Sequence, residues 1–484
     1  MMNLVVIQRV LGLLLMVFSL TMLPPAVVGY YYQDGDIAPF LEGFALLLGC
    51  GLLLWAPVRR VRHELKLRDG FIIVVLFWLG LGLAGSLPLI LSSSPVISVT
   101  DAVFESISGL TTTGATVLTG LDELPHAILI YRQQLQWLGG MGIIVLAVAV
   151  LPMLGVGGMQ LFRAETPGPV KDAKLTPRIT ETAKALWYIY LVLTALCALS
   201  YWLAGMQPFD AISHAFATVS IGGFSTHDAS IGYFDNPAIE LVAVVFMLIS
   251  GMNFALHFYF WKKRSLRPYW QDSEWRTYLA LIVAASAFVV ALIDSDHVTR
   301  EVSGALRLGI FQTVSIATTS GFAVTDYRHW PPFIPVLLLF MSFVGGCAGS
   351  TGGGIKVVRM LLLFKQGFRE TFRLIHPNAM MLVKLRGQPM SEGVIEAVWG
   401  FFSAYVFIFV VLMLLMLFTG MDQVTAFSAV AASLNNLGPG LGDVADNYAS
   451  ISDIQKWILC LAMLFGRLEI FTLLVVLTPS FWRR

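Results

Sequence analysis

Apolar residues recur along the whole chain in runs of about 20, the length that an α-helix needs to cross a bilayer. Polar and charged residues gather between these runs. The first run ends in MLPPAVVGYYY, which lacks a small-residue cleavage pattern, so we expect an uncleaved span here and not a signal peptide. The pattern predicts ten spans, at Val10–Val28, Pro39–Ala56, Phe71–Leu91, Arg132–Leu154, Ala183–Ala204, Ile239–Phe260, Tyr278–Ile293, Pro332–Phe364, Ile395–Phe418 and Trp457–Leu477.

Composition narrows the class of protein. Of the 484 residues, 57% are hydrophobic and 13% are charged, whereas soluble domains are roughly half apolar and a quarter charged. This balance excludes an ordinary soluble enzyme, a disordered chain and a nucleic-acid-binding protein. A membrane-embedded enzyme would need paired aspartates, a serine with a histidine, or a histidine cluster, and the spans contain no such set. We therefore expect a protein that is not an enzyme, with no catalytic residues and no organic cofactor.

Lysine and arginine indicate the orientation of the spans. They cluster after every second span, at Arg59–Arg68, Arg163–Arg178, Lys262–Arg267 and Lys356–Arg386, and again at Arg483 and Arg484. Residues 206–240 and 420–455, in the alternate loops, contain neither. The loop after the seventh span is the exception, with Arg300, Arg307 and Arg328. By the positive-inside rule we expect both termini in the cytoplasm.

After the first two spans the chain repeats itself four times as span, outer segment and span. The outer segments are Asp101–Thr116, Asp210–Ser225, Leu308–Ala323 and Thr425–Gly440. Aligned without gaps, they share a glycine at one position: Gly114, Gly223, Gly321 and Gly438. Three residues earlier each has a small polar residue: Thr111, Ser220, Thr318 and Asn435. We call residues 111–116, 220–225, 318–323 and 435–440 filter segments 1 to 4.

About ten moderately apolar residues precede each glycine, too few to span a membrane but enough for a re-entrant half-helix. Each repeat crosses the membrane twice, so all four share one orientation and can close around a central axis. Non-helical backbone at membrane depth requires burial in protein or water, which a pore provides. The negative C-terminal ends of the half-helices would favour a cation. Four repeats of one orientation argue against an organic-solute transporter built from inverted repeats.

The chain resembles the Trk/Ktr/HKT superfamily of potassium transporters, and within it the TrkH branch, over essentially its whole length. The resemblance lies in TTTGAT (Thr111–Thr116), IGGFSTHDAS (Ile221–Ser230), GGCAGSTGGGIK (Gly345–Lys356), NNLGPGLG (Asn435–Gly442) and FGRLEIFTLL (Phe465–Leu474). It implies an all-α membrane protein in which two N-terminal spans precede four span–pore helix–span repeats around a pore. The implied units are residues 1–68 and repeats at 69–178, 179–275, 276–390 and 391–484.

The resemblance also implies that one glycine per repeat lines a potassium selectivity filter. Relatives with serine at the first position favour sodium, so Gly114 implies potassium. Segment 4 departs furthest, because Pro439 follows its glycine. The implied filter residues, which would offer backbone carbonyl groups to K+, are Thr112, Thr113, Gly114, Ile221, Gly222, Gly223, Thr319, Ser320, Gly321, Asn436, Leu437 and Gly438.

The eighth span is interrupted by GGCAGSTGGG, and so many glycines make a poor helix interior. The sequence predicts a flexible intramembrane loop below the filter, residues 345–354, which acts as a gate; a tight helix-packing seam is the alternative. Arg467 within the last span would repel cations there, or pair with Glu469 or with loop carbonyls. The predicted gate residues are Gly345, Gly346, Gly349, Gly352, Gly353, Gly354 and Arg467.

We therefore expect potassium uptake across a bacterial inner membrane through a channel-like pore. The alternative is a potassium symporter coupled to H+ or Na+. The resemblance implies a homodimer and a cytosolic TrkA-like regulator that binds NAD or ATP/ADP, and membrane lipid surrounds the spans. The basic segments Arg163–Lys184, Lys262–Arg276 and Lys365–Arg386 are candidate docking surfaces, although the positive-inside rule alone explains them equally well.

Overall fold

The structure is a computed structural model that describes residues 4–34, 37–60, 67–145, 179–296, 298, 301–379, 381–385 and 387–483. Their regular secondary structure is helical except for two short strands, β1 (Lys384–Leu385) and β2 (Gln388–Pro389), which pair as an antiparallel hairpin. The helices are α1 (Leu4–Ser19), α2 (Leu23–Tyr32), α3 (Ala38–Trp55), α4 (Leu67–Gly85), α5 (Leu87–Leu91), α6 (Val99–Leu110), α7 (His126–Val145), α9 (Ile179–Leu203), α10 (Pro208–Ser220), α11 (Pro237–Ser250), α12 (Phe254–Lys263), α13 (Arg267–Gln271), α14 (Ser273–Ser295), α15 (Val302–Ala317), α16 (Phe333–Val344), α17 (Val357–Ile375), α18 (Glu392–Phe418), α19 (Gln423–Asn435), α20 (Asp453–Arg467), α21 (Phe471–Leu477) and α22 (Pro479–Trp482).

Several of these helices are long and apolar enough to cross a membrane. Six stretches qualify, and the number rises to eight if the bent pairs α11–α12 and α20–α21 each count as one span. The helix α7 follows the fourth predicted span as far as Val145, and the rest of Arg132–Leu154 lies outside the described residues. The apolar helix α16 has only 12 residues. Each of the ten predicted apolar runs therefore coincides, at least in part, with a helix.

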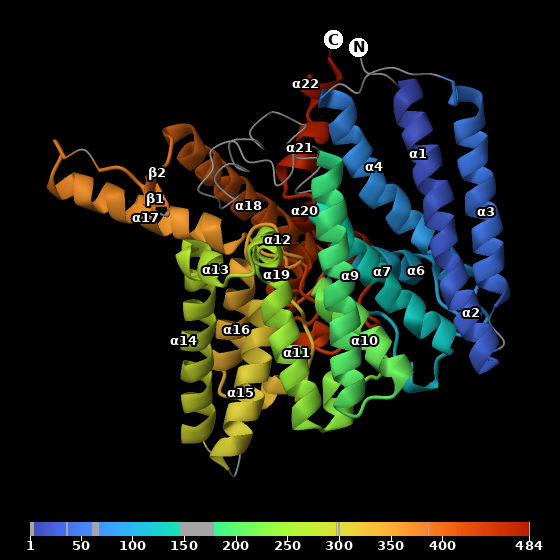
Figure 1. Cartoon of the computed structure of the whole chain (residues 1–484), viewed down its shortest axis with the longest axis horizontal. Coiled ribbons are helices and arrows are strands. Elements are labelled where there is room, and N and C mark those ends of the chain that lie inside the picture. Colours follow the sequence, from blue (N-terminus) through green and yellow to red (C-terminus); the bar gives the residue numbers. More distant parts are fainter. Residues whose placement is uncertain are drawn as a thin grey trace.

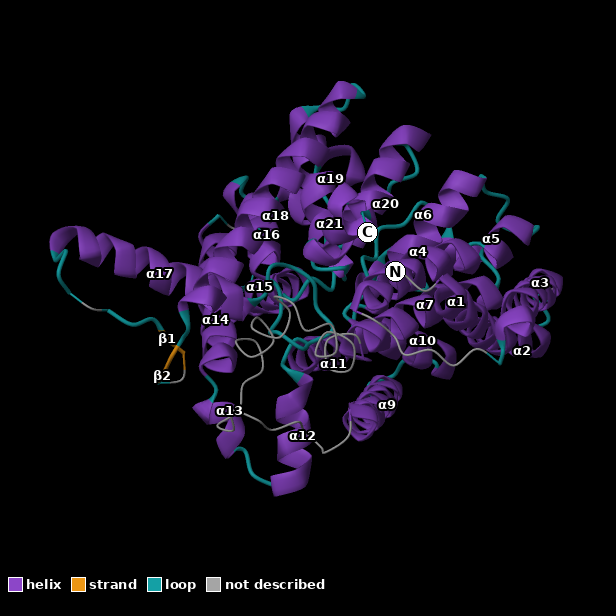
Figure 2. Ribbon diagram, turned by 90° about the horizontal axis from the view of Figure 1, so that it is seen from above, coloured by secondary structure: helices purple, strands orange, loops and turns teal. Residues whose placement is uncertain are grey.

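The four repeats surround a common centre, which Figure 2 shows from above. The second helix of each repeat packs on the short outer-segment helix of the next: α7 on α10, α11 on α15, α16 on α19, and α20 on α6. This order closes a ring from repeat 4 back to repeat 1. The N-terminal helices α1 to α3 lie outside the ring, where α1 packs on α4 and α2 on α7. The two ends of the described chain lie on the same side of the molecule (Figure 1).

The short helices α6, α10, α15 and α19 have 12, 13, 16 and 13 residues. At 1.5 Å per residue they are about 18 to 24 Å long, which is less than the ~30 Å hydrocarbon core. Local signals fix where they begin: the Ser98 side chain accepts the Asp101 N–H at α6, Pro208 is the first residue of α10, and Asp422 caps α19. They have the length of the predicted half-helices, and we call them pore helices.

The second helices of repeats 2 and 4 are sharply bent, where we predicted unbroken spans at Ile239–Phe260 and Trp457–Leu477. The bend is 92° between α11 and α12 and 115° between α20 and α21. At the first bend the Asn253 side chain caps α12. At the second, Glu469 and Ile470 both have positive φ values, of 50° and 56°. The prediction of straight spans is wrong because hydropathy measures apolar content and carries no information about direction.

The break predicted within Pro332–Phe364 is confirmed, because α16 ends at Val344 and α17 begins at Val357. The continuation differs from the prediction. The helix α17 runs beyond Phe364 to Ile375, across the direction of α14, and projects away from the repeats (Figures 1 and 2). It interleaves basic residues with leucine and phenylalanine, a pattern that suits an amphipathic helix better than the second half of a span.

Candidate ion-conduction site

All four pore helices end in the same backbone conformation. In each, the residue two before the filter glycine is left-handed although it is not a glycine; the φ values are 54°, 56°, 69° and 52° at Thr112, Ile221, Thr319 and Asn436. The next residue donates its N–H to the carbonyl five residues back, in the bonds Thr113 to Ser108, Gly222 to Ala217, Ser320 to Ser315 and Leu437 to Ala432, at 2.8–2.9 Å. This is a Schellman-type end, which turns the chain out of the helix at one fixed point.

The four glycines form a closed ring. The distances from a Cβ atom placed on each glycine to its nearest neighbours show this. At Gly114 it would lie 2.1 Å from the Gly222 carbonyl oxygen, and at Gly223 1.9 Å from that of Ser320. At Gly321 it would lie 3.1 Å from the Gly438 nitrogen, and at Gly438 2.6 Å from the Gly114 oxygen. Each filter segment thus abuts the next in the order 1, 2, 3, 4 and back to 1. A Cβ at Gly114, Gly223 or Gly438 would collide with backbone, and at Gly321 it would lie 2.8 Å from Cδ of Pro439, so glycine is required by space.

Segment 4 departs from the other three. Gly114, Gly223 and Gly321 have φ values of 82°, 79° and 83°, but Gly438 does not have a positive φ. The residue after it is Pro439, and a proline restricts the backbone of the residue that precedes it. The Tyr448 hydroxyl also donates to the Gly438 carbonyl at 2.9 Å. The ring is therefore fourfold in arrangement but not in detail.

Side-chain amides of one residue outside the predicted site, Gln136, and one within it, Asn436, support the ring. The Gln136 side chain donates to the Gly222 carbonyl at 2.7 Å and accepts the Phe224 N–H at 3.1 Å. The Asn436 amide donates to the Thr113 hydroxyl at 3.1 Å, which joins segment 4 to segment 1. Gln136 is not among the predicted site residues, because its position in α7 gives no signal except that a polar residue lies within an apolar span.

The glycine-rich loop 345–354 lies against the C-terminal ends of three pore helices. The Thr351 hydroxyl donates to the Val219 carbonyl of α10 at 3.0 Å. The Gly353 N–H donates to the Thr319 hydroxyl at 2.7 Å, and the Gly354 N–H donates to the Asn435 carbonyl at 3.1 Å. Two of these bonds satisfy carbonyls at helix ends that have no intrahelical partner. The loop therefore covers helix ends that carry partial negative charge.

The glycines of this loop are needed for two reasons. Gly345, Gly349 and Gly354 have φ values of 66°, 69° and 74°. At Gly345 a Cβ would lie 2.2 Å from the Gly353 oxygen, and at Gly353 1.9 Å from the Asn435 oxygen. A Cβ at Gly346 would lie 2.7 Å from the Ser350 hydroxyl oxygen, and a Cβ at Gly352 would lie 3.0 Å from the Thr318 carbonyl oxygen. The backbone here is folded on itself and on the pore helices.

Arg467 is the last residue of α20 and connects the loop to α7. It is 1% exposed, and its guanidinium donates to the Thr351 carbonyl at 3.2 Å and to the Gly139 carbonyl at 3.0 Å. The predicted alternative of a pair with loop carbonyls is therefore confirmed. The alternative of a pair with Glu469 is wrong, because Glu469 binds Arg359 at 2.6 Å instead.

The surroundings of the loop carry an excess of positive charge. A cavity of about 10 Å³, about the room that one water molecule needs, is lined by loop glycines, Lys356, Arg359, Arg467 and Glu469. The Lys356 ammonium group donates to the Gly352 carbonyl. Three buried cations and one carboxylate thus line the same cavity.

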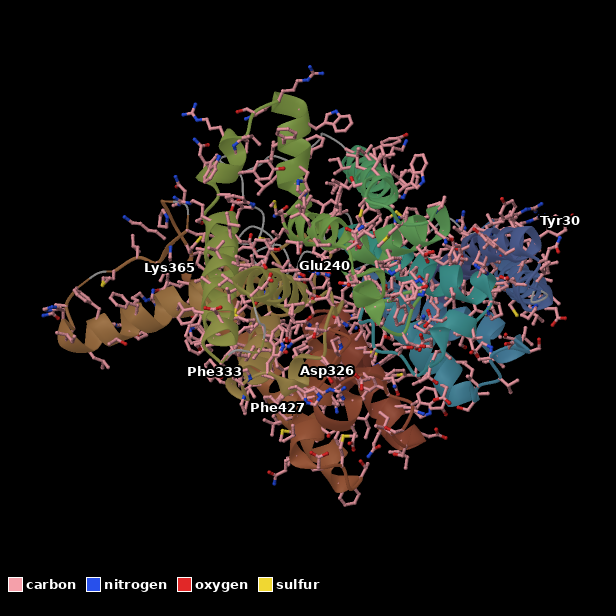
Figure 3. The ribbon with its side chains drawn as sticks, turned by 90° about the horizontal axis from the view of Figure 1, so that it is seen from below. Tyr30, Glu240, Asp326, Phe333, Lys365 and Phe427 are labelled. Carbon is pink, nitrogen blue, oxygen red and sulfur yellow. The ribbon has the colours of Figure 1, made fainter. Side chains whose placement is uncertain are left out.

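The outer ends of the repeats are joined by charged pairs. Figure 3 views the molecule from below and labels two of the acids, Glu240 and Asp326. Arg307, one of the cations that broke the positive-inside pattern, binds Glu240 at 2.6 Å; Arg328, another, binds Asp326 at 2.7 Å. At least one pair crosses each repeat boundary: His227 with Asp122, Arg307 with Glu240 and with Asp235, Arg328 with Asp446, and Lys456 with Asp101.

The comparison with known proteins agrees with this geometry. The TrkH family, described as "Cation transport protein", matches residues 37–483. The Trk system potassium uptake protein TrkH of Vibrio parahaemolyticus is 61% identical over 479 residues, 99% of each chain, and that of Escherichia coli K12 is 57% identical over 477 residues, also 99% of each. The crystal structure of the potassium transporter TrkH from Vibrio parahaemolyticus superposes with a TM-score of 0.93 over all of both chains, at 58% identity.

Proposed function

The chain belongs to the TrkH family of cation transport proteins, and we propose from that membership that it takes up potassium through the ring of four filter segments. As a cation transport protein it is a multi-pass membrane transporter and not an enzyme. The single observation that carries the proposal is the closed ring, in which each filter glycine abuts the backbone of the next segment. A ring of this kind brings four short backbone segments to one axis.

Selectivity follows from the carbonyl groups of those segments. Backbone carbonyls of residues 112–114, 221–223, 319–321 and 436–438 would replace the hydration shell of K+. The shared left-handed turn at the end of each pore helix supports this, because it starts all four segments from equivalent points. Segment 4 differs at Gly438, so we expect fewer ion sites than a symmetric filter would provide.

The gate is the loop 345–354 together with Arg467. In the state described here the loop covers three pore-helix ends, and Arg467 ties it to α7. Opening would require these hydrogen bonds to break, which uncovers the helix ends and withdraws positive charge from the exit. The carbonyls that select the ion and the loop that closes the exit belong to different residues, although the loop bonds to Thr319 and Asn435 of filter segments 3 and 4. Changes to the loop should therefore alter flux far more than selectivity.

A cytosolic TrkA-like regulator that binds NAD or ATP/ADP would bias the loop between two states. The chain itself would form a homodimer in a bacterial inner membrane, with both termini in the cytoplasm, and the regulator would dock on that homodimer. The relatives are named as components of a Trk system, which supports a multi-protein assembly. Of the candidate docking surfaces, Lys262–Arg276 and most of Lys365–Arg386 lie in α12–α14 and around α17, whereas residues 163–178 lie outside the described residues. Co-purification with the regulator, followed by single-channel recording with ATP or ADP, tests this; no complex and no change in activity would exclude it.

The purified chain in liposomes distinguishes the proposed channel from a symporter. Potassium flux is followed with an electrode while K+, Na+ and a protonophore are varied separately. A channel carries K+ down its electrochemical gradient at a rate that neither Na+ nor a proton gradient changes. Flux that vanishes with the protonophore or without Na+ would establish coupled symport, and absence of potassium flux would refute the proposal.

A further inference from the structure

The residue nine before each filter glycine lies behind the filter, and its identity differs among the repeats: Glu105, His214, Gln312 and Ala429. Glu105 accepts the Thr116 hydroxyl at 3.0 Å and the Val117 N–H at 2.9 Å. Nε2 of His214 lies 2.9 Å from the Ser225 hydroxyl. Thr116 and Ser225 are equivalent, since each is two residues after its filter glycine. In repeats 1 and 2, therefore, one position of the pore helix supports one position of the outgoing filter segment.

Arg132 of α7 contacts Glu105 and the outgoing ends of both filter segments. Its Nε donates to Glu105 at 2.7 Å, and its Nη2 donates to the Thr116 hydroxyl at 2.9 Å. Its Nη1 donates across the repeat boundary to the Ser225 carbonyl at 3.2 Å, and the guanidinium lies 4.3 Å above the Phe224 ring. One side chain thus holds the outgoing ends of filter segments 1 and 2 together. Arg132 is 1% exposed and Glu105 is 0% exposed.

Repeats 3 and 4 lack this arrangement. Neither amide atom of Gln312 has a hydrogen-bond partner among the described residues, and Ala429 has no polar group to offer. Among the described residues, the ion pair behind the filter therefore lies on one side of the ring, between segments 1 and 2. A buried ion pair is retained only where hydrogen bonds satisfy both partners, and here those hydrogen bonds go to the filter segments themselves.

We infer that Arg132 is a positioning residue that sets potassium-over-sodium selectivity, acting through Glu105, Thr116 and Ser225 on filter segments 1 and 2. The inference rests on the proposed function and adds to it a residue behind the filter that contributes to selectivity. Arg132 touches no transported ion. It fixes the spacing of two backbone segments, and discrimination between K+ and Na+ depends on how rigidly and how far apart the carbonyls are held.

The test compares Arg132→Gln with Lys456→Gln. The control is matched because Lys456 is also a buried cation, paired at 2.6 Å with an acid of the same pore helix, Asp101. That acid lies at the start of α6, away from the filter. The readout is the ratio of K+ to Na+ permeability, from reversal potentials in planar bilayers. This ratio does not depend on how much protein folds, so a merely structural role would not move it.

Arg132→Gln should lower the ratio by about tenfold, equivalent to ~1.4 kcal/mol of lost discrimination, while Lys456→Gln leaves it unchanged. Arg132→Lys, which keeps the charge but not the fork of donors, should give an intermediate ratio. An unchanged ratio in Arg132→Gln overturns the inference, and so does an equal fall in both glutamine variants. A wild-type ratio near one would instead refute the proposed function, and this inference with it.

A milder pair of variants decides the case if Arg132→Gln does not assemble. Thr116→Val removes the hydroxyl that both Arg132 and Glu105 contact, with little change in volume. Thr313→Val is its control, because this buried pore-helix hydroxyl has no hydrogen-bond partner among the described residues. The inference predicts a lower ratio in Thr116→Val alone, and an unchanged ratio in that variant contradicts it.

Discussion

Serine at position 114 should admit sodium, because its Cβ cannot fit against repeat 2. The Cβ would lie 2.1 Å from the Gly222 carbonyl oxygen, whereas ordinary contact begins near 3.4 Å. Filter segments 1 and 2 would therefore have to move apart by about 1.3 Å (3.4 − 2.1). Functional sites are held to within roughly 0.5 Å. The φ of 82° at Gly114 adds strain of about 1–2 kcal/mol for any side chain. Both effects act on the ring and not on the gate.

A control for the backbone strain alone lies in the same repeat. Gly120 has a φ of 68° and no atom within 4 Å of its Cβ position. Gly114→Ser should lower the K+ to Na+ permeability ratio by about tenfold, or ~1.4 kcal/mol, as measured from reversal potentials in planar bilayers. Gly120→Ser should lower only the thermal unfolding midpoint. If the two variants have the wild-type ratio, the placement of Gly114 in the filter is wrong.

Three further predictions concern the gate and the outer face. Gly353→Ala places a Cβ 1.9 Å from the Asn435 oxygen and should displace the loop, so liposome flux should rise while selectivity stays nearly intact. Gly367→Ala is the control, because its Cβ has open space. Equal flux in the two variants would contradict the assignment of the loop as a gate. Arg467→Gln should raise single-channel open probability at an unchanged permeability ratio, and an open probability equal to wild type would count against a gating role. Burial alone would lower the pKa of His227, but the nearby carboxylates of Asp210 and Asp122 outweigh it and raise the pKa above its ordinary 6.5. Protonated His227 therefore stabilises the fold fully below about pH 6.5, and this stabilisation is lost as pH rises through the folded pKa. The unfolding midpoint of the wild type should exceed that of His227→Gln by an amount that shrinks with rising pH. A difference that stays constant with pH would contradict this prediction.

Much of the ring could be predicted from sequence because it repeats. The four glycines align without gaps, and the small polar residues three positions earlier mark the ends of the pore helices. The broken eighth span could be predicted for the same kind of reason, since a run of glycines is visible without any partner. In each case the signal is local.

The remaining features depend on contacts between distant residues. Arg467 is conspicuous in an apolar span, but its acceptors, Thr351 and Gly139, are 116 and 328 residues away along the chain. The bends after Ser250 and Arg467 are held by tertiary contacts, such as the Cys347 N–H donating to the Gly251 carbonyl at 2.9 Å. Hydropathy and spacing carry no record of such partners.

The most direct test of the account is the reversal potential of the wild-type chain in a planar bilayer with KCl on one side and NaCl on the other, with a protonophore present. The account predicts a current through discrete channels whose reversal potential approaches the equilibrium potential of K+ and is unaffected by the protonophore. A reversal potential near zero would show that the ring does not select potassium and would contradict the central claim.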